Sequence, residues 1–331
     1  NSPNQTLKTK IKAMHKNQNE NQNEAHTIYN PLPAAAIARL SSLPKCAYVT
    51  AGPRSYIRGM SCIAKRLEAV GAHYPLLTMV EEEDETFMRA NLHVNNHAHS
   101  MVLPWHAFPA NSTHVIGIRG ERTMDKMNLF GLPLRRIVWI DADMYVRENI
   151  DELCELPVDV HFAAALNAAR GRPTYVWPSR SASRHCIRQF NITENRLRYV
   201  ARSAADLRPR PNECPYIFQT GAMVITPLNL ARFNAEVVGP LQHSSVQSYD
   251  GTDQGAINTL LYGAARIFGD AYARLHARYN VIARHRSHSE VFWNGLPSAL
   301  VHHTGKSGRP WQSSSNMSEW HGGCATAVAR L

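Results

Sequence analysis

Long apolar runs, closely spaced cysteine pairs and acidic side chains are all scarce in this chain of 331 residues. No stretch approaches the ~18 consecutive apolar residues that a membrane helix needs, so we expect no membrane span within the chain. The cysteines show no Cys-x-x-Cys spacing and so do not indicate a metal site. Lysine and arginine number 36 against 26 acids, a formal net charge of +10, but no nucleic-acid-binding motif accompanies this excess. We therefore expect no nucleic-acid partner.

The composition changes near residue 30. Residues 16–24 consist of Lys, Asn, Gln and Glu and offer no apolar face, so we predict that residues 1–30 form a disordered polar tail or stem. The chain as a whole is 44% hydrophobic, enough for one sizeable core, and we predict a single domain over residues 31–331. The first residue is Asn1 rather than Met, which we interpret as a processed form or a fragment, so a membrane anchor outside the chain stays open.

Three segments near the start of the globular part predict a parallel sheet. Residues 46–51 are apolar enough for a strand, residues 55–70 carry apolar side chains at helical spacing, and residues 75–80 are predicted as a second strand. A strand, a helix and a strand in this order imply a right-handed crossover between parallel strands. The predicted fold class is therefore α/β.

A further strand ends in two aspartates. Residues 137–140 read Ile-Val-Trp-Ile and predict a buried strand, and Asp141 and Asp143 follow it directly. Two carboxylates on a short turn suit a hard divalent cation such as Mg²⁺ or Mn²⁺, whose remaining ligands come from water and a diphosphate. This chemistry is typical of enzymes that use nucleotide sugars. The alternative is a solvated pair of loop acids, because Asp-x-Asp is a common tripeptide.

Two distant segments supply the other groups that such a site needs. Asp253 and Gln254 offer an acid and an amide near a reacting sugar. Residues 302–311 offer an imidazole for the metal and a cation for phosphate oxygens. Because residues 254–262 show helical spacing, Asp253 has an alternative role as the amino-terminal cap of that helix.

The order of these motifs resembles glycosyltransferase family eight, the group of glycogenin and galactinol synthase. Members of that family carry a lysine at a helix start, a strand ending in Asp-x-Asp, an Asn-Ile-Asp and a Phe-Asn-x-Gly-like strand. An Asp-Gln, a Tyr-Asn and a closing His-x-x-Gly-type loop follow. The matching segments here are 126–130, 137–143, 149–151, 218–224, 253–258, 279–280 and 302–311. They run in the family's order from about Lys45 to Trp311.

The resemblance implies a GT-A-type nucleotide-diphospho-sugar transferase fold, with a mostly parallel Rossmann-like sheet and helices on both faces. It also implies an enzyme that moves a hexose from a UDP-sugar to an acceptor with retention. The implied cofactor is Mn²⁺, with Mg²⁺ as the alternative ion. The competing hypothesis is a non-catalytic relative that keeps the fold and binds a nucleotide sugar or a glycan.

The site residues are carried over position by position. The implied metal ligands are Asp141, Asp143 and His302. Counting back from Pro310-Trp311 selects His302, and strand alternation allows only one of His302 and His303 to face the cation. The implied catalytic residues are Asp253, Gln254 and Lys126. The implied donor-binding residues are Thr50, Tyr56, Lys126, Ala142, Gln219, Gly305 and Arg309, with Tyr56 placed to stack on the base.

Ordinary structural roles compete with two of these assignments, and three positions depart from the family pattern. Tyr56 could be a half-buried tyrosine after a glycine-proline turn, and Lys126 a solvated lysine at a helix end. Gln219 stands where glycogenin-like proteins have Asn, and Asn167 where they have Asp, so UDP-glucose is not inherited as the donor. Arg309 replaces the usual lysine and keeps the positive charge.

Residues from about 170 to 214 have no counterpart in compact family members. This Arg-rich insertion holds ten arginines against three acids and lies between two site-forming strands. We expect it to face the acceptor, a glycan or a protein that is acidic, while an anionic membrane surface is a further candidate. A compositional habit of the organism is the alternative. The sequence indicates no oligomeric state.

A few features bear on the compartment. Cys186 and Cys214 flank much of the insertion and could join in a disulfide if the compartment is oxidising. Glycosylation sequons begin at Asn4, Asn111, Asn191 and Asn316, a number that an Asn-rich chain also reaches by chance. Together with the stem-like start, these features favour the Golgi lumen over the cytoplasm.

Overall fold

The computed structural model describes residues 28–40, 45–92, 100–109, 121–166, 198–200, 218–243, 248, 252–262, 267–269, 271–283, 286–287, 295–303, 310–311 and 324. Most of the predicted tail and most of the Arg-rich insertion lie outside these residues. The described part begins within the predicted tail, where the Tyr29 amide donates to Asn234 Oδ1 and Asn234 Nδ2 donates back to the Tyr29 carbonyl, both at 2.8 Å. Tyr29 is therefore packed onto the domain.

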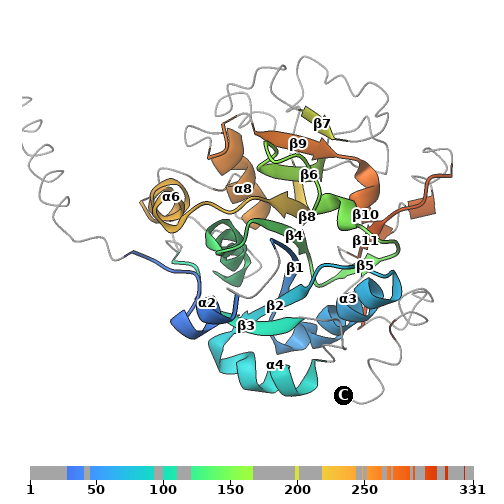
Figure 1. Ribbon diagram of the computed structural model, residues 1–331, viewed down its shortest axis with the longest axis horizontal. Coiled ribbons are helices and arrows are strands. Elements are labelled where there is room, and N and C mark those ends of the chain that lie inside the picture. Colours follow the sequence, from blue (N-terminus) through green and yellow to red (C-terminus); the bar gives the residue numbers. More distant parts are fainter. Residues whose placement is uncertain are drawn as a thin grey trace, which may run out of the picture.

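The central element is an eight-stranded sheet (Figure 1). Its strands are β1 (Cys46–Ala51), β2 (Leu76–Glu81), β3 (Met101–Trp105), β4 (Arg136–Ile140), β6 (Phe162–Leu166), β7 (Arg198–Val200), β8 (Phe218–Ile225) and β9 (Tyr272–Leu275). They lie in the order β3-β2-β1-β4-β8-β6-β9-β7. Only β8 runs antiparallel to its neighbours in this sheet. The mostly parallel α/β sheet confirms the predicted fold, and β1, β2 and β4 confirm the strands predicted at residues 46–51, 75–80 and 137–140.

A small second sheet explains how distant segments meet. It consists of β5 (Met144–Val146), β10 (Val281–Ile282) and β11 (Leu300–His302), in the order β10-β11-β5. β11 pairs antiparallel with β5, and His302 lies opposite Met144. This register places the end of β11 beside the turn that carries Asp141 and Asp143.

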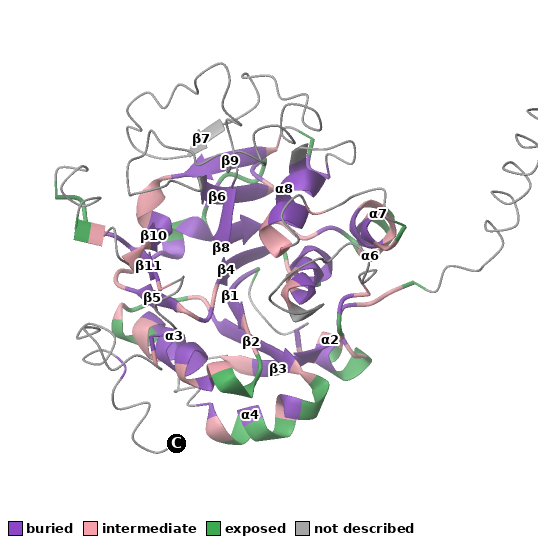
Figure 2. Ribbon diagram, turned by 180° about the vertical axis from the view of Figure 1, so that it is seen from behind, coloured by how far each residue is buried: buried purple, intermediate pink, exposed green. Residues whose placement is uncertain are grey.

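Helices cover both faces of the large sheet, as predicted. They are α2 (Ala34–Leu40), α3 (Ile57–Ala69), α4 (Glu85–Asn91), α6 (Leu230–Phe233), α7 (Gly239–Gln242) and α8 (Asp253–Tyr262), with a π-helical turn at Asn234–Val238 between α6 and α7. Short 3₁₀ segments lie at Arg54–Tyr56, Glu82–Asp84, Glu121–Gly131, Asp151–Leu153 and Ala277–Tyr279. Alternate residues of β1 face different cores, because Val49 belongs to the same buried cluster as Ile257 of α8, whereas Tyr48 belongs to the cluster that includes Ile63 of α3. Figure 2 shows that most of β1, β2, β4, β6, β8 and β9 is buried.

One detail of the helices bears on the site. Lys126 was predicted to open a helix, but it lies inside the 3₁₀ segment Glu121–Gly131. The helix start therefore lies upstream of the prediction.

Among the described residues, none of the helices has both the length and the apolar character to cross a membrane.

Two disulfides fix the domain at long range. Cys46 in β1 is bonded to Cys154, and Cys62 in α3 is bonded to Cys324 near the end of the chain. Neither pair was predicted, since the partners are 108 and 262 residues apart and spacing carries no signal for them. Cys186 and Cys214 lie outside the described residues, so their pairing stays a prediction.

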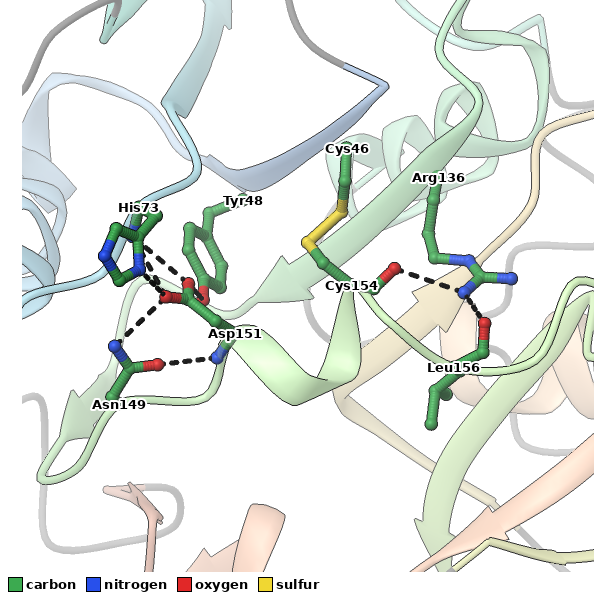
Figure 3. Close-up of a disulfide and its surroundings, with 8 residues drawn as sticks. All are labelled: Cys46, Tyr48, His73, Arg136, Asn149, Asp151, Cys154 and Leu156. Atoms are coloured by element: carbon green, nitrogen blue, oxygen red, sulfur yellow. Dashed lines mark hydrogen bonds and ion pairs between the residues drawn. A yellow bond between two sulfur atoms is a disulfide. The ribbon is translucent and has the colours of Figure 1, made fainter.

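The Asn149–Asp151 motif lies beside the first disulfide (Figure 3). Asp151 accepts hydrogen bonds from the Tyr48 hydroxyl at 2.6 Å, from the His73 backbone amide at 3.0 Å and from Asn149 Nδ2 at 3.0 Å. The His73 ring lies 2.7 Å from the same carboxylate. This motif, which matched the family by sequence, therefore ties β1, the segment after α3 and the turn after β5 together.

Candidate metal and donor site

Three potential metal ligands converge at the carboxyl end of β4. Asp141 and Asp143 lie on the turn between β4 and β5, and His302 ends β11. His302 Nε2 lies 3.1 Å from Asp143 Oδ1 and 3.8 Å from Asp141 Oδ2. One ligand atom from each of the three residues lies within 4.8 Å of the others. Two carboxylates and one imidazole at this spacing form a donor set that suits a divalent cation.

His302 is held with Nε2 facing the carboxylates. Its Nδ1 lies 3.1 Å from Asn280 Oδ1, and an N–H donated to that oxygen leaves the lone pair on Nε2. Gly221 makes room for the ring, since a Cβ there would lie 2.5 Å from His302 Cε1. Burial lowers the pKa of His302, but the charges of Asp143 and Asp141 raise it by more than burial lowers it, so the net pKa of His302 lies above its usual value. His302, rather than His303, thus occupies the cluster.

The two aspartates differ in their electrostatics. Burial raises the pKa of Asp141. The charges of Lys126 and His302 oppose this rise, whereas those of Asp143 and Asp253 add to it, and the net pKa of Asp141 is raised. Burial also raises the pKa of Asp143, but the charge and hydrogen bond of His302 outweigh burial and the net pKa is lowered. A cation between these groups would offset the crowding of their negative charges.

Lys126 links the metal ligands to the predicted reaction centre. Its Nζ lies 2.9 Å from Asp141 Oδ1 and 2.6 Å from Asp253 Oδ2. It also donates to the Thr220 carbonyl at 3.3 Å. Burial lowers the pKa of Lys126, but the two carboxylates raise it well above its usual value. The lysine is neither solvated nor at a helix end, so that ordinary structural alternative is wrong.

Asp253 is the first residue of α8, and its side chain points into the site. The Ala256 amide donates to the Thr252 carbonyl at 3.1 Å, so the helix cap lies one residue earlier than the alternative role assumed. The Asp253 carboxylate instead binds Lys126 and accepts from the Thr220 hydroxyl at 3.0 Å. Capping therefore does not explain Asp253.

A buried amide fixes α8 against β8. Asn258 Oδ1 accepts from the Phe218 backbone amide at 2.8 Å, and Asn258 Nδ2 donates to the Phe218 carbonyl at 3.0 Å and to the Gln254 carbonyl at 2.8 Å. Half-buried Gln254 and buried Gln219 are thereby held on neighbouring elements. The prediction included Asn258 only as part of a motif. Its position one helical turn after Gln254 was the available signal.

Thr50 in β1 and Tyr56 shortly after it are two of the predicted donor-binding positions. Val49 pairs with Trp139, so buried Thr50 lies level with Ile140, one strand away from Asp141. Tyr56 is half-buried, and its ring packs edge-to-face on Trp311 with centroids 5.3 Å apart. Their roles toward a nucleotide stay predictions.

Helix α3 approaches the aspartate turn closely. A Cβ at Gly59 would lie 2.1 Å from the Ala142 carbonyl oxygen and 2.6 Å from the Trp311 ring. A glycine inside a helix costs roughly 1 kcal/mol relative to alanine, and here only glycine leaves room for this contact. Gly305, Arg309 and Asn167 lie outside the described residues.

Comparisons with known proteins bear on the family and the fold. The model for the family described as glycosyl transferase family 8 matches residues 126–315, more than half of the chain. A structure of an active-site mutant of LgtC aligns with a TM-score of 0.58 at 14% identity over 86% of this chain and 97% of that one. The galactosyltransferase LgtC with donor and acceptor sugar analogs gives 0.50 at 15% identity over 84% and 99%.

One further structure covers nearly all of this chain. The apo form of the bifunctional glycosyltransferase WbbM aligns with a TM-score of 0.57 at 14% identity, over 92% of this chain but 51% of that one. At such identities the likeness shows the fold alone. No curated protein matches the chain by sequence.

Proposed function

Because the chain belongs to glycosyl transferase family 8 and has the mixed α/β fold of GT-A glycosyltransferases, we propose that it moves a hexose from a UDP-sugar to an acceptor with retention. The observation that carries this proposal is the cluster of Asp141, Asp143 and His302 beside Lys126 and Asp253. It combines a metal-binding donor set with an acid from a separate helix. A nucleotide-sugar transferase needs both at one sheet edge.

Asp141, Asp143 and His302 would hold Mn²⁺, with Mg²⁺ as the alternative. The fit rests on the donor set, on the hydrogen bond that leaves the His302 lone pair on Nε2, and on the space that Gly221 provides. Such an ion neutralises a diphosphate leaving group and orients it. The remaining roles fall to the side chains of this chain.

Asp253 and Gln254 would act at the sugar. The Asp253 side chain is held at the start of α8 by Lys126 and Thr220. A carboxylate and an amide beside the anomeric carbon would stabilise positive charge there as the diphosphate leaves. The resemblance implies that Lys126 contacts the donor, at the diphosphate or a sugar hydroxyl, but its two ion pairs favour a different role. We assign it to holding Asp141 and Asp253 in place.

The nucleotide would occupy the edge formed by β1, α3 and the aspartate turn. Thr50 and Tyr56 would contact the uridine, Ala142 the ribose side of the diphosphate, and Gly305 and Arg309 the phosphate oxygens. The closeness of Tyr56 to Trp311 supports this placement, because it brings the closing segment to the same edge. An aromatic wall of this kind suits a base.

A donor hydrolysis panel tests the proposal. Purified protein is incubated with UDP-glucose, UDP-galactose and related UDP-sugars, with Mn²⁺, with Mg²⁺ and with EDTA, and release of UDP is measured. We expect release with at least one donor, only in the presence of a metal. A protein that binds a donor in calorimetry but releases no UDP under any condition would be the non-catalytic relative instead.

The donor sugar depends on the pocket around Gln219. This side chain is buried on β8, next to Thr220, which binds Asp253. A longer amide than the family's Asn shifts which sugar hydroxyls can be hydrogen-bonded, and an unpaired hydroxyl costs roughly 1–3 kcal/mol. Gln219→Asn should therefore change the preference among UDP-sugars in the same panel.

The acceptor, which we propose to be an acidic glycan or protein, would be recognised by the Arg-rich insertion. Its charge would steer an anionic acceptor in a salt-dependent manner. Exchange of Arg196, Arg198 and Arg202 for Glu should lower transfer to acidic oligosaccharides, most at low ionic strength, and leave donor hydrolysis unchanged. A parallel loss of hydrolysis would assign the insertion a structural role.

We propose the Golgi lumen as the compartment. The two disulfides of the domain support an oxidising environment, since such bonds persist mainly in secretory compartments. Thiol titration of the denatured, unreduced protein isolated from its cells tests this. Free thiols at Cys46 and Cys154 would point to the cytoplasm.

A further inference from the structure

The two carboxylate oxygens of Asp141 have different surroundings. Oδ1 accepts from the indole Nε1 of Trp139 at 2.7 Å and lies 2.9 Å from Lys126 Nζ. Oδ2 lies on the side of His302, 3.8 Å from its Nε2. One oxygen is thus fully engaged by the protein, while the other faces the proposed metal ligands.

The sequence places Trp139 where it can do this. Trp139 and Asp141 are two residues apart along an extended segment, so their side chains point to the same face. Trp139 is only 3% exposed and pairs in register with Val49 on one side and Met223 on the other. Its ring is therefore held by the core, and the N–H has a fixed direction.

Lys126 and Trp139 restrain Asp141 in different ways. The ammonium is a rotatable point charge that Asp141 shares with Asp253. The indole offers a single N–H in a fixed plane, so it defines the orientation of the carboxylate. The Lys126 ammonium lies 5.3 Å from the centre of the Trp139 ring, which sets both groups on the same side of Asp141.

We propose that Trp139 is a positioning residue, which holds Asp141 by Oδ1 so that Oδ2 is presented to the metal ion. The proposal rests on the metal-dependent function proposed above. Groups that orient a ligand from behind typically change metal affinity by about 10–100-fold when they are removed. Nothing in the Asp-x-Asp pattern itself requires an indole at this position.

The experiment compares Trp139→Phe with Trp105→Phe. Phenylalanine keeps a ring under Lys126 and removes the N–H. Trp105 is a matched control, because it is 6% exposed and lies on β3 of the same sheet. Mn²⁺ affinity of the full chain is measured without donor, by electron paramagnetic resonance of the free ion, and the melting temperature is measured in EDTA.

We expect Trp139→Phe to weaken Mn²⁺ binding about tenfold and Trp105→Phe to leave it unchanged. In the hydrolysis assay, the Mn²⁺ concentration for half-maximal rate should rise by the same factor, while kcat at saturating Mn²⁺ stays within about twofold. A purely structural role would lower the melting temperature of both variants and leave Mn²⁺ affinity unchanged.

Equal Mn²⁺ affinity of Trp139→Phe and the wild type would overturn the inference. Failure of the wild type to bind Mn²⁺ would instead overturn the metal-dependent function, so the two failures are distinguishable. If Trp139→Phe does not fold, 3-benzothienylalanine at position 139 provides the second variant. This residue keeps the bicyclic ring and lacks the N–H, and unchanged affinity with it would equally reject the proposal.

Discussion

Asp141 directly follows β4 and Asp151 lies in the 3₁₀ segment after β5, and the two carboxylates have opposite surroundings. Asp151 accepts hydrogen bonds from Tyr48, His73 and Asn149, and each of these three partners is an uncharged donor group: a hydroxyl, a backbone amide and a side-chain amide. Asp141 is crowded by Asp143 and Asp253, and its charge is offset by Lys126, which Asp253 also binds. The first arrangement satisfies a single charge within the protein.

The pKa shifts of the two aspartates express the same contrast. Burial raises the pKa of Asp151, but its hydrogen bonds from Tyr48, His73 and Asn149 outweigh burial and hold it below the usual value. Burial and two neighbouring acids leave the pKa of Asp141 above its usual value. Satisfied charge indicates a structural role and crowded like charge indicates a binding role. Both motifs match the family by sequence, and only Asp141 of the two aspartates was predicted as a site residue.

The largest effect should come from neutralising a crowded acid. Asp143→Asn removes one proposed metal ligand, so metal-dependent UDP release should fall at least about a hundredfold. The fold should persist, because the change relieves repulsion with Asp141. UDP release at limiting Mn²⁺ and the melting temperature in EDTA are the measurements. Release near the wild-type level would reject Asp143 as a ligand.

A second test makes the same comparison within α8. Gln254 is half-buried at the proposed reaction centre, whereas Asn258 is buried and bonded to Phe218. Gln254→Ala should lower turnover by roughly 100-fold and leave UDP affinity unchanged, since the amide would face the sugar. Turnover rates and calorimetric titration with UDP provide the two values. An equal loss of UDP affinity would place Gln254 at the nucleotide.

Sequence reasoning succeeded where signals were local and failed where partners were distant. The strand 137–140 and the helix near Asp253 were predictable, because apolar periodicity sets them. The cluster of Asp141, Asp143 and His302 was placed through the resemblance, and the structure brings these residues together.

Other features had no local signal. The Lys126 ion pairs arise from side chains on three separate elements, and periodicity says nothing about them. The hydrogen bond from His302 Nδ1 to Asn280 Oδ1 depends on the pairing of β11 with β5 and β10. The disulfides depend on the full three-dimensional fold.

The reverse of the first test is Asp151→Asn. Asparagine would direct its own N–H groups toward the donors of His73 and Asn149, so we expect a loss of about 2 kcal/mol in the free energy of unfolding. Mn²⁺ affinity should not change. Urea denaturation and Mn²⁺ titration test this pair of outcomes. Wild-type stability in Asp151→Asn, or a change in its Mn²⁺ affinity, would erase the contrast with Asp143→Asn.

The smallest expected effect is the pH dependence of that difference. Because the folded-state pKa of Asp151 lies below its ordinary value of about 3.9, its ionised form stabilises the fold above that value. This stabilisation is lost as the pH falls through the folded pKa, at no more than about 1.4 kcal/mol per pH unit. The stability gap between wild type and Asp151→Asn should therefore be constant from pH 7 to pH 5 and shrink below about pH 4.

Urea denaturation of the wild type and Asp151→Asn at pH 7, 5 and 3.5 measures this stability gap. The difference between the two free energies of unfolding cancels the titration of all other groups to first order. Tyr48→Phe is the matched control, because it removes one donor to Asp151 and keeps the charge. It should lower stability at pH 7 by roughly 1 kcal/mol, and its gap should also narrow in acid. A gap that widens as the pH falls from 7 to 5 would show that the folded-state pKa of Asp151 lies above its ordinary value, as the pKa of Asp141 does. Asp151 would then resemble the crowded acids, and the division between the two clusters would be wrong.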